Sequence, residues 1–194
     1  MSISITTQIL LAHVAYMKEY RGITSGDEPF DGGSYPASGK GDVNNFLVMK
    51  DGRYYGFVEP NSKNKKKPDK APTPINIKRL GAKSTDIKID DVCVVFFARD
   101  YTTGTCKNGM VIVGCYLNGT VYKDYQSPTA ISGHGYNLSC DATQAFLFAE
   151  QDRKEIMVSN TRPMVLYGFL SNTGRQVTTK KDIVDLINRL IQRP

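Results

Sequence analysis

Short apolar runs separated by turn residues dominate the hydrophobic pattern of this chain and predict a protein built mainly from β-strands. Residues 9–14 are expected to form a buried first strand. Residues 92–98 are continuously apolar, which is typical of a strand at the centre of a sheet. Shorter runs predict three further strands at 145–149, 156–158 and 164–169.

A first hairpin is expected where Asp51-Gly52 separates the strand-like runs 43–49 and 54–58, because Asp-Gly favours a tight turn. The segment between Thr24 and Gly41 is rich in glycine and predicts a long irregular loop. Residues 75–80 alternate in polarity, as an edge strand does.

A second hairpin is expected at Asn118-Gly119, between the runs 110–117 and 120–125. Both central residues of a type I′ turn need positive φ, and Asn-Gly is the pair that favours it most. Residues 127–142 lack periodicity and predict an irregular segment.

The C-terminal residues 178–193 are expected to form a helix that packs on the rest of the domain. Thr179 is a suitable N-cap, Asp182 stands at the capping-box position, and Pro194 closes the pattern. The apolar positions follow helical spacing at Ile183, Leu186, Ile187, Leu190 and Ile191.

These elements predict an α+β fold in a single domain, residues 1–194. Its core would be a curled, mostly antiparallel β-barrel over residues 9–170, with flanking helices that include the C-terminal one. Within this core, residues 61–74 predict a mobile basic loop with five lysines: Lys63, Lys65, Lys66, Lys67 and Lys70.

The chain has 25 Lys and Arg and 19 Asp and Glu, which give a net charge of +6. This positive net charge favours an anionic partner. Nucleic acid is the first candidate for such a partner. No apolar run is long enough to span a bilayer and no signal peptide is recognisable, so we expect a cytoplasmic protein without a membrane partner. The four cysteines are expected to be reduced and mostly buried.

Most catalytic chemistry is disfavoured. The chain has no phosphate-loop or dinucleotide fingerprint, no G-x-S-x-G motif and no zinc-like spacing of Cys and His, so we expect no cofactor, no metal and no catalytic residue. One enzymatic alternative is a small Mg²⁺-dependent nuclease that uses Asp69, Asp86 and Lys88. A protein-interaction domain that binds no nucleic acid is a further alternative.

Aromatic residues suggest a binding surface, since the chain has 11 Tyr and 8 Phe but no Trp. A tyrosine offers a flat face on which a base can stack and a hydroxyl that reaches the edge of the base.

The strand 111–116 with its Gly114, the short turn and the strand 120–123 resemble a barrel hairpin of the PUA-like superfamily. This superfamily contains the EVE, ASCH, YTH and SRA domains. Further motifs resemble the N-terminal reader domains of modification-dependent restriction proteins: Ala15-Tyr16-Met17-Lys18, Tyr20, Gly22, Gly32-Gly33-Ser34-Tyr35, Asn45-Phe46 and Tyr54-Tyr55-Gly56-Phe57-Val58.

The resemblance implies a binding module, rather than an enzyme, that recognises a modified or flipped base in double-stranded DNA. Tyr16, Tyr35 and Phe46 would wall the base pocket, and Ser34 and Asn45 would read the base edge. Phosphates would be held by Lys18, Arg21, Lys63, Lys65, Lys66 and Lys67. Such a module would act alone or together with a nuclease on another chain.

Overall fold

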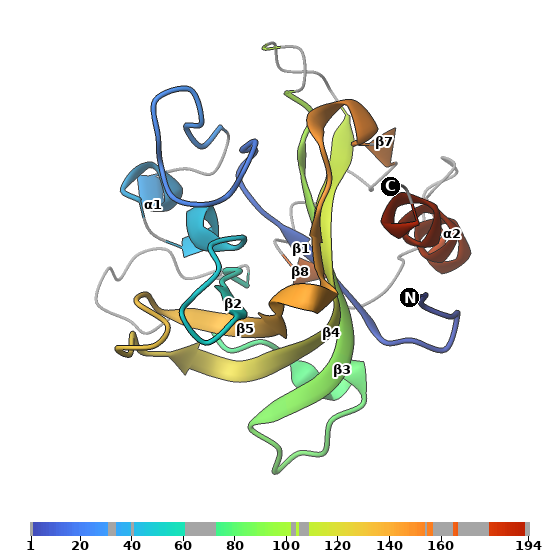
Figure 1. Cartoon of the computed structure of the whole chain (residues 1–194). Coiled ribbons are helices and arrows are strands. Elements are labelled where there is room, and N and C mark those ends of the chain that lie inside the picture. The colour runs from blue at the N-terminus through green and yellow to red at the C-terminus, as the bar shows by residue number, and fades with distance from the viewer. Residues whose placement is uncertain are drawn as a thin grey trace.

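The computed structural model describes residues 2–30, 34–39, 41–60, 73–101, 104, 109–153, 155–156, 165–166 and 179–192. The strands are β1 (Ile9–His13), β2 (Arg53–Gly56), β3 (Lys88–Arg99), β4 (Met110–Gln126), β5 (Tyr136–Asp141), β6 (Ala145–Leu147), β7 (Glu155–Ile156) and β8 (Val165–Leu166) (Figure 1). The α-helices are α1 (Ser34–Ala37) and α2 (Lys180–Ile191). Short 3-10 helices lie at Gly41–Asn44, Ile77–Leu80, Ala142–Gln144 and Glu150–Asp152.

The strands form one sheet in the order β2-β5-β4-β3-β1-β8, and β6 and β7 also pair with β4. Only the β1–β3 pair is parallel among the pairs in the described residues. The α+β class and the mostly antiparallel sheet are therefore confirmed. No pairing among the described residues joins β2 to β8, so the sheet is open there rather than closed into a barrel.

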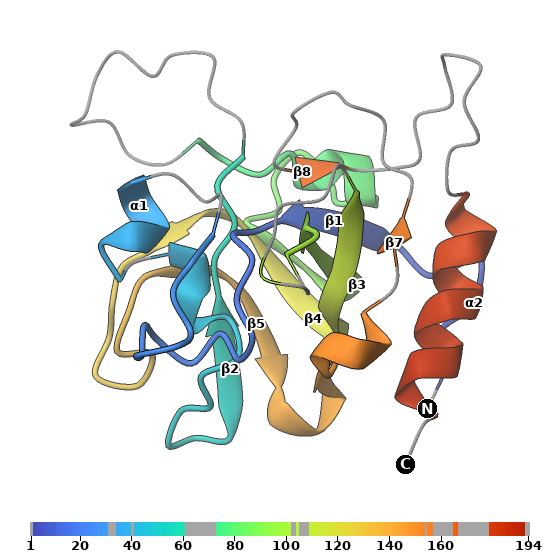
Figure 2. The same cartoon turned by 90° about the horizontal axis from the view of Figure 1, so that it is seen from above.

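The sheet buries apolar side chains on both faces, because alternate residues of a strand point to opposite sides. On β3, Val94 and Phe96 belong to one core cluster, and Val95 and Phe97 belong to the other. Helix α2 covers the second cluster, whereas the chain between β1 and β2 covers the first (Figures 1 and 2).

Helix α2 begins as the sequence predicts. Thr179 and Asp182 form a reciprocal capping box, and Ile183 and Ile187 are fully buried. Asn188 ties the helix to the start of the chain, since its side chain accepts from the Ile3 amide at 2.8 Å and donates to the Ile3 carbonyl at 2.9 Å. The expected packing of the C-terminal helix on the domain is confirmed.

The hairpin expected at Asn118-Gly119 is wrong, because β4 continues through both residues as a 17-residue strand. Gly119 pairs with Val92 at a break in the β3–β4 register, where Asp91 has φ +59°. A Cβ on Gly119 would lie 3.2 Å from the Val92 carbonyl oxygen. The glycine thus permits a close approach of two strands at a bulge, not a turn.

Two other expected strands are wrong. Residues 43–49 contain the end of a 3-10 helix followed by turns, and residues 77–80 of the expected edge strand form another 3-10 helix. Conversely, the segment 127–142, expected to be irregular, contains β5. For β5, pairing with β2 and β4 outweighs the local pattern.

Three of the four cysteines are free and buried, namely Cys93, Cys115 and Cys140, as expected. Burial raises the pKa of Cys93 to about 12, so this thiol stays protonated and unreactive at neutral pH. Cys106 lies outside the described residues. None of the described helices has the length and apolar character needed to cross a membrane.

Candidate binding cleft

The segment that follows β1, residues 15–20, lacks regular secondary structure, yet its backbone is held by buried charged side chains. Asp42 accepts from the Ala15 amide at 2.6 Å. Asp27 accepts from the amides of Lys18 at 2.5 Å and Glu19 at 2.8 Å. Buried backbone groups need partners, and here side chains provide what a sheet or helix would otherwise supply.

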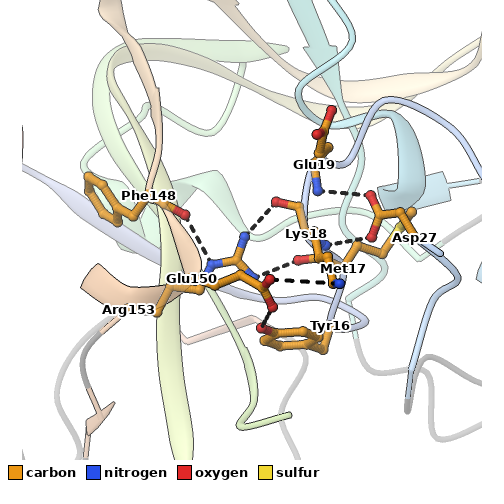
Figure 3. Close-up of polar contacts among 8 residues, drawn as sticks. All are labelled: Tyr16, Met17, Lys18, Glu19, Asp27, Phe148, Glu150 and Arg153. Atoms are coloured by element: carbon orange, nitrogen blue, oxygen red, sulfur yellow. Dashed lines mark hydrogen bonds and ion pairs between the residues drawn. The ribbon is translucent and has the colours of Figure 1, made fainter. Parts of the chain in front are cut away.

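Arg153 holds the same segment from the other side (Figure 3). Its guanidinium donates to the carbonyls of Met17 and Lys18, both at 2.6 Å, and to the Phe148 carbonyl at 3.1 Å. Its guanidinium carbon also lies 5.0 Å from the centre of the Tyr16 ring. Arg153 is only 6% exposed, so it links the end of β6 to the segment after β1 through the interior.

Asp42 gives this arrangement a pH dependence. Burial raises its pKa to about 6, and the charge of Glu59 acts in the same direction. The folded state therefore binds this proton more tightly than the unfolded chain, so its contribution favours folding at low pH and is lost as the pH rises from about 4 to about 6. The interval corresponds to roughly 3 kcal/mol.

We expect Asp42→Asn to remove this slope, because the neutral amide oxygen can still accept from the Ala15 amide. Urea unfolding at pH 4, 5, 6 and 7 would measure this difference. As the pH rises from 4 to 7, the free energy of unfolding of the variant should increase relative to that of the wild type by roughly 3 kcal/mol. An identical pH slope in both proteins would contradict this role of Asp42.

A cleft of about 450 Å³ opens beside this held segment. Residues from four parts of the chain line it: Tyr16, Lys18, Gly26, Asp27, Glu28, Tyr101, Gly104 and Glu150. We refer to it as the Tyr101 cleft. Its volume lies within the range of about 300–1,000 Å³ that is usual for sites of small organic groups.

Aromatic rings stabilise one side of the Tyr101 cleft. Phe30 stacks on Tyr101 with ring centres 3.9 Å apart, and Tyr16 meets Tyr101 edge-on at 6.1 Å. Backbone hydrogen bonds between Tyr16 and Phe30, of 2.8 and 2.9 Å, fix the two residues against each other. The half-buried Tyr101 thus faces the cleft on a rigid aromatic support.

Polar groups occupy the other side. Tyr16 donates its hydroxyl to Glu150 at 2.7 Å, and Lys18 lies 3.8 Å from the same carboxylate. Burial, followed by that hydrogen bond, raises the pKa of Tyr16, so its hydroxyl stays protonated as a donor. Glu28 is exposed at the rim. With Asp27 the cleft holds three carboxylates against one ammonium group, and its local charge is negative.

The structure brings only part of the expected base pocket together. Of its residues, Tyr16 lines the Tyr101 cleft, where it is joined by Lys18, which was expected to hold phosphate. Phe46 instead lies in the core, 2% exposed, among the rings of Tyr20, Tyr54, Phe96 and Tyr116. Asn45 is fully buried, and its amide pairs with the backbone of Phe57 at 2.8 and 3.1 Å. Neither of these two side chains lines the cleft.

Ser34 and Tyr35 lie in α1, but their side chains are outside the described part of the structure. Arg21 is exposed and lies 3.8 Å from Glu19. The expected phosphate-binding residues of the basic loop lie outside the described residues: Lys63, Lys65, Lys66 and Lys67.

The residues of the nuclease alternative are engaged elsewhere or not described. Asp86 accepts from the Lys83 amide at 2.6 Å, and Lys88 pairs with Asp90 at 3.1 Å. Asp69 lies outside the described residues. Within the described ranges, no three His, Cys, Asp or Glu side chains gather closely enough to hold a metal ion.

The sequence did not single out most residues that line or support the cleft. Phe30 and Tyr101 had a weak signal, since aromatic residues in loops are uncommon unless they pack or bind. Glu150 and Arg153 had none, because their roles depend on contacts with residues some 135 positions away.

Comparisons with models of protein families, with characterised proteins and with solved structures found no match to this chain.

Proposed function

We propose that this protein is a nucleic-acid-binding module that holds an unstacked base in the Tyr101 cleft and reads its amino edge. The observation that carries the proposal is the juxtaposition, in about 450 Å³, of a supported aromatic ring with carboxylates and an ammonium group. The net charge of +6 and the resemblance to PUA-like readers support the same assignment. A relationship to PUA-like domains, here with an open sheet, and a nuclease on another chain belong to this proposal too.

Tyr101 would supply the stacking face. Its own stacking on Phe30 immobilises the ring before a base arrives, so less conformational entropy is lost on binding. Stacking of a base on an aromatic side chain contributes about 1–3 kcal/mol. That is comparable with the few kcal/mol needed to extrude a base from a duplex, an amount that is smaller when the base pair is already weakened.

The polar side of the cleft fits a base with an amino group. Cytosine presents a donor beside acceptors, and carboxylates are its usual partner at the amino group. Glu28 or Glu150 would accept from that group, and Lys18 would donate to the neighbouring acceptor. The negative charge of the cleft disfavours phosphate there, so the backbone has to be bound elsewhere on the surface.

Fluorescence anisotropy tests the proposal. The probes are one labelled duplex with cytosine, 5-methylcytosine, 5-hydroxymethylcytosine, N6-methyladenine or thymine at a single unpaired position. We expect the best amino-bearing base to bind at least about tenfold more tightly than thymine, a difference of about 1.4 kcal/mol. Tyr101→Ala should remove this preference before it removes binding.

Tyr122→Ala is the matched control, because Tyr122 is a half-buried tyrosine that packs on Tyr136 and not in the cleft. It should keep the preference for the base. Equal affinity for all probes in the wild type, at both low and moderate salt, would refute base reading and leave a non-specific basic surface.

A further inference from the structure

A second groove, remote from the Tyr101 cleft, gathers positive charge. Lys78, Lys83 and Lys123 line a groove of about 220 Å³ together with Asn76, Ser84 and Asp86. The three lysines come from a 3-10 helix, from the turn before β3 and from β4, and backbone hydrogen bonds join these segments. We call this site the lysine groove.

The backbone around the lysine groove is firmly connected. Lys123 accepts from the Ile75 amide at 2.7 Å and donates to the Ile87 carbonyl at 2.8 Å. The buried side chains of Ile75 and Ile77 form part of the lining. The sheet and the 3-10 helix packed on it therefore hold the groove. The backbone at each of the three lysines is fixed in place.

The lysines of the groove have no acidic partner within ion-pair distance among the described residues. The one carboxylate that lines the groove, Asp86, is hydrogen-bonded to the Lys83 amide at 2.6 Å. Three exposed lysines against one engaged carboxylate leave a net positive site. This is the opposite of the Tyr101 cleft, where carboxylates outnumber the ammonium group.

The two sites lie at opposite ends of β3. Lys83 and Asp86 precede its first residue, Lys88, whereas Tyr101 follows its last residue, Arg99 (Figure 1). A variant in one site is thus not expected to disturb the other.

We propose that the lysine groove binds phosphates of the nucleic-acid backbone, while the Tyr101 cleft reads the base. The inference rests on the proposed function and assigns phosphate binding to residues other than Lys18 and Arg21. Lysine binds phosphate as a point charge, and each phosphate that it neutralises releases counterions from the duplex. Binding through the groove would therefore depend steeply on salt, whereas stacking in the cleft would not.

The test is the salt dependence of duplex binding by a double variant, Lys83→Ala with Lys123→Ala. If both lysines contact phosphates, the slope of log affinity against log salt concentration should become shallower by about 1.8, because each contact contributes about 0.9. The preference between base probes should not change. The control, Lys50→Ala with Lys181→Ala, removes two exposed lysines outside the groove and matches the change in net charge.

Three outcomes overturn the proposal and are distinguishable. Equal slopes in the groove variant and the control would refute the groove but leave base reading in place. Absence of duplex binding by the wild type at low salt would refute both. Loss of binding to phosphatidylserine vesicles in the groove variant, with the duplex slope unchanged, would reassign the groove to an anionic membrane surface. Thermal unfolding of each variant checks that its fold is intact.

Discussion

Replacing Arg153 with alanine is expected to lower the free energy of unfolding by about 3–5 kcal/mol, the largest loss for any single side chain near the cleft. The change removes three hydrogen bonds from a charged donor and leaves the carbonyls of Met17, Lys18 and Phe148 without that partner. Each hydrogen bond of this kind contributes about 1.5–3 kcal/mol. The cation over the Tyr16 ring is lost as well.

Urea unfolding monitored by circular dichroism measures the loss. Arg153→Lys should recover only part of it, because an ammonium group cannot reach three carbonyls in the planar geometry of guanidinium. Arg21→Ala is the control, since Arg21 is exposed at the surface, and it should change stability by less than about 0.5 kcal/mol. A loss below about 1 kcal/mol for Arg153→Ala would mean that the three hydrogen bonds of Arg153 contribute little to stability.

The second large effect is expected for Gly114→Ala on β4, at about 3 kcal/mol of lost stability. A Cβ at this position would lie 2.6 Å from the Phe146 carbonyl oxygen and 2.6 Å from Cζ of Phe46. One contact is backbone of the paired strand β6, and the other belongs to a buried ring surrounded by aromatic residues. Neither can move without disturbing the core, and overpacked cores typically lose about 1–3 kcal/mol.

Gly119→Ala, on the same strand, is the comparison. Its nearest contact would be 3.2 Å, to the Val92 carbonyl oxygen, so a small shift suffices and the loss should be about 1 kcal/mol. Thermal and urea unfolding of both variants would rank them. Equal losses in the two variants would show that any glycine replacement on β4 has the same effect. The close contact with Phe46 would then add nothing to the loss at Gly114.

Local signals predicted the elements whose formation depends on their own sequence. The capping box at Thr179 and the helical stripe of α2 are satisfied within one segment, and the unbroken apolar run of β3 fits any central strand. The signal at Asn118-Gly119 was misleading because a glycine that allows a turn also allows a close approach of strands. Only the position of Val92 decides between the two.

The site was less predictable than the fold, because most of its contacts join residues that are far apart in the sequence. Tyr16 and Lys18 follow the first strand and were found from the motif around them. Phe46 and Asn45 belong to the same resemblance, but the segment between β1 and β2 packs them inside, with Phe46 against the rings of Phe96 and Tyr116. Tyr101, Glu150 and Arg153 come from distant segments, and only the completed sheet brings them to Tyr16.

The length of β4 has a consequence for synthesis on the ribosome. This strand pairs with β3 on one edge and with β5, β6 and β7 on the other, and β2 joins the sheet only through β5. A nascent chain that ends before residue 110 can therefore pair β1 with β3 but leaves β2 unpaired and the apolar face of β3 uncovered. We expect such chains to remain bound by chaperones and to fold cooperatively only after β5 has emerged from the exit tunnel.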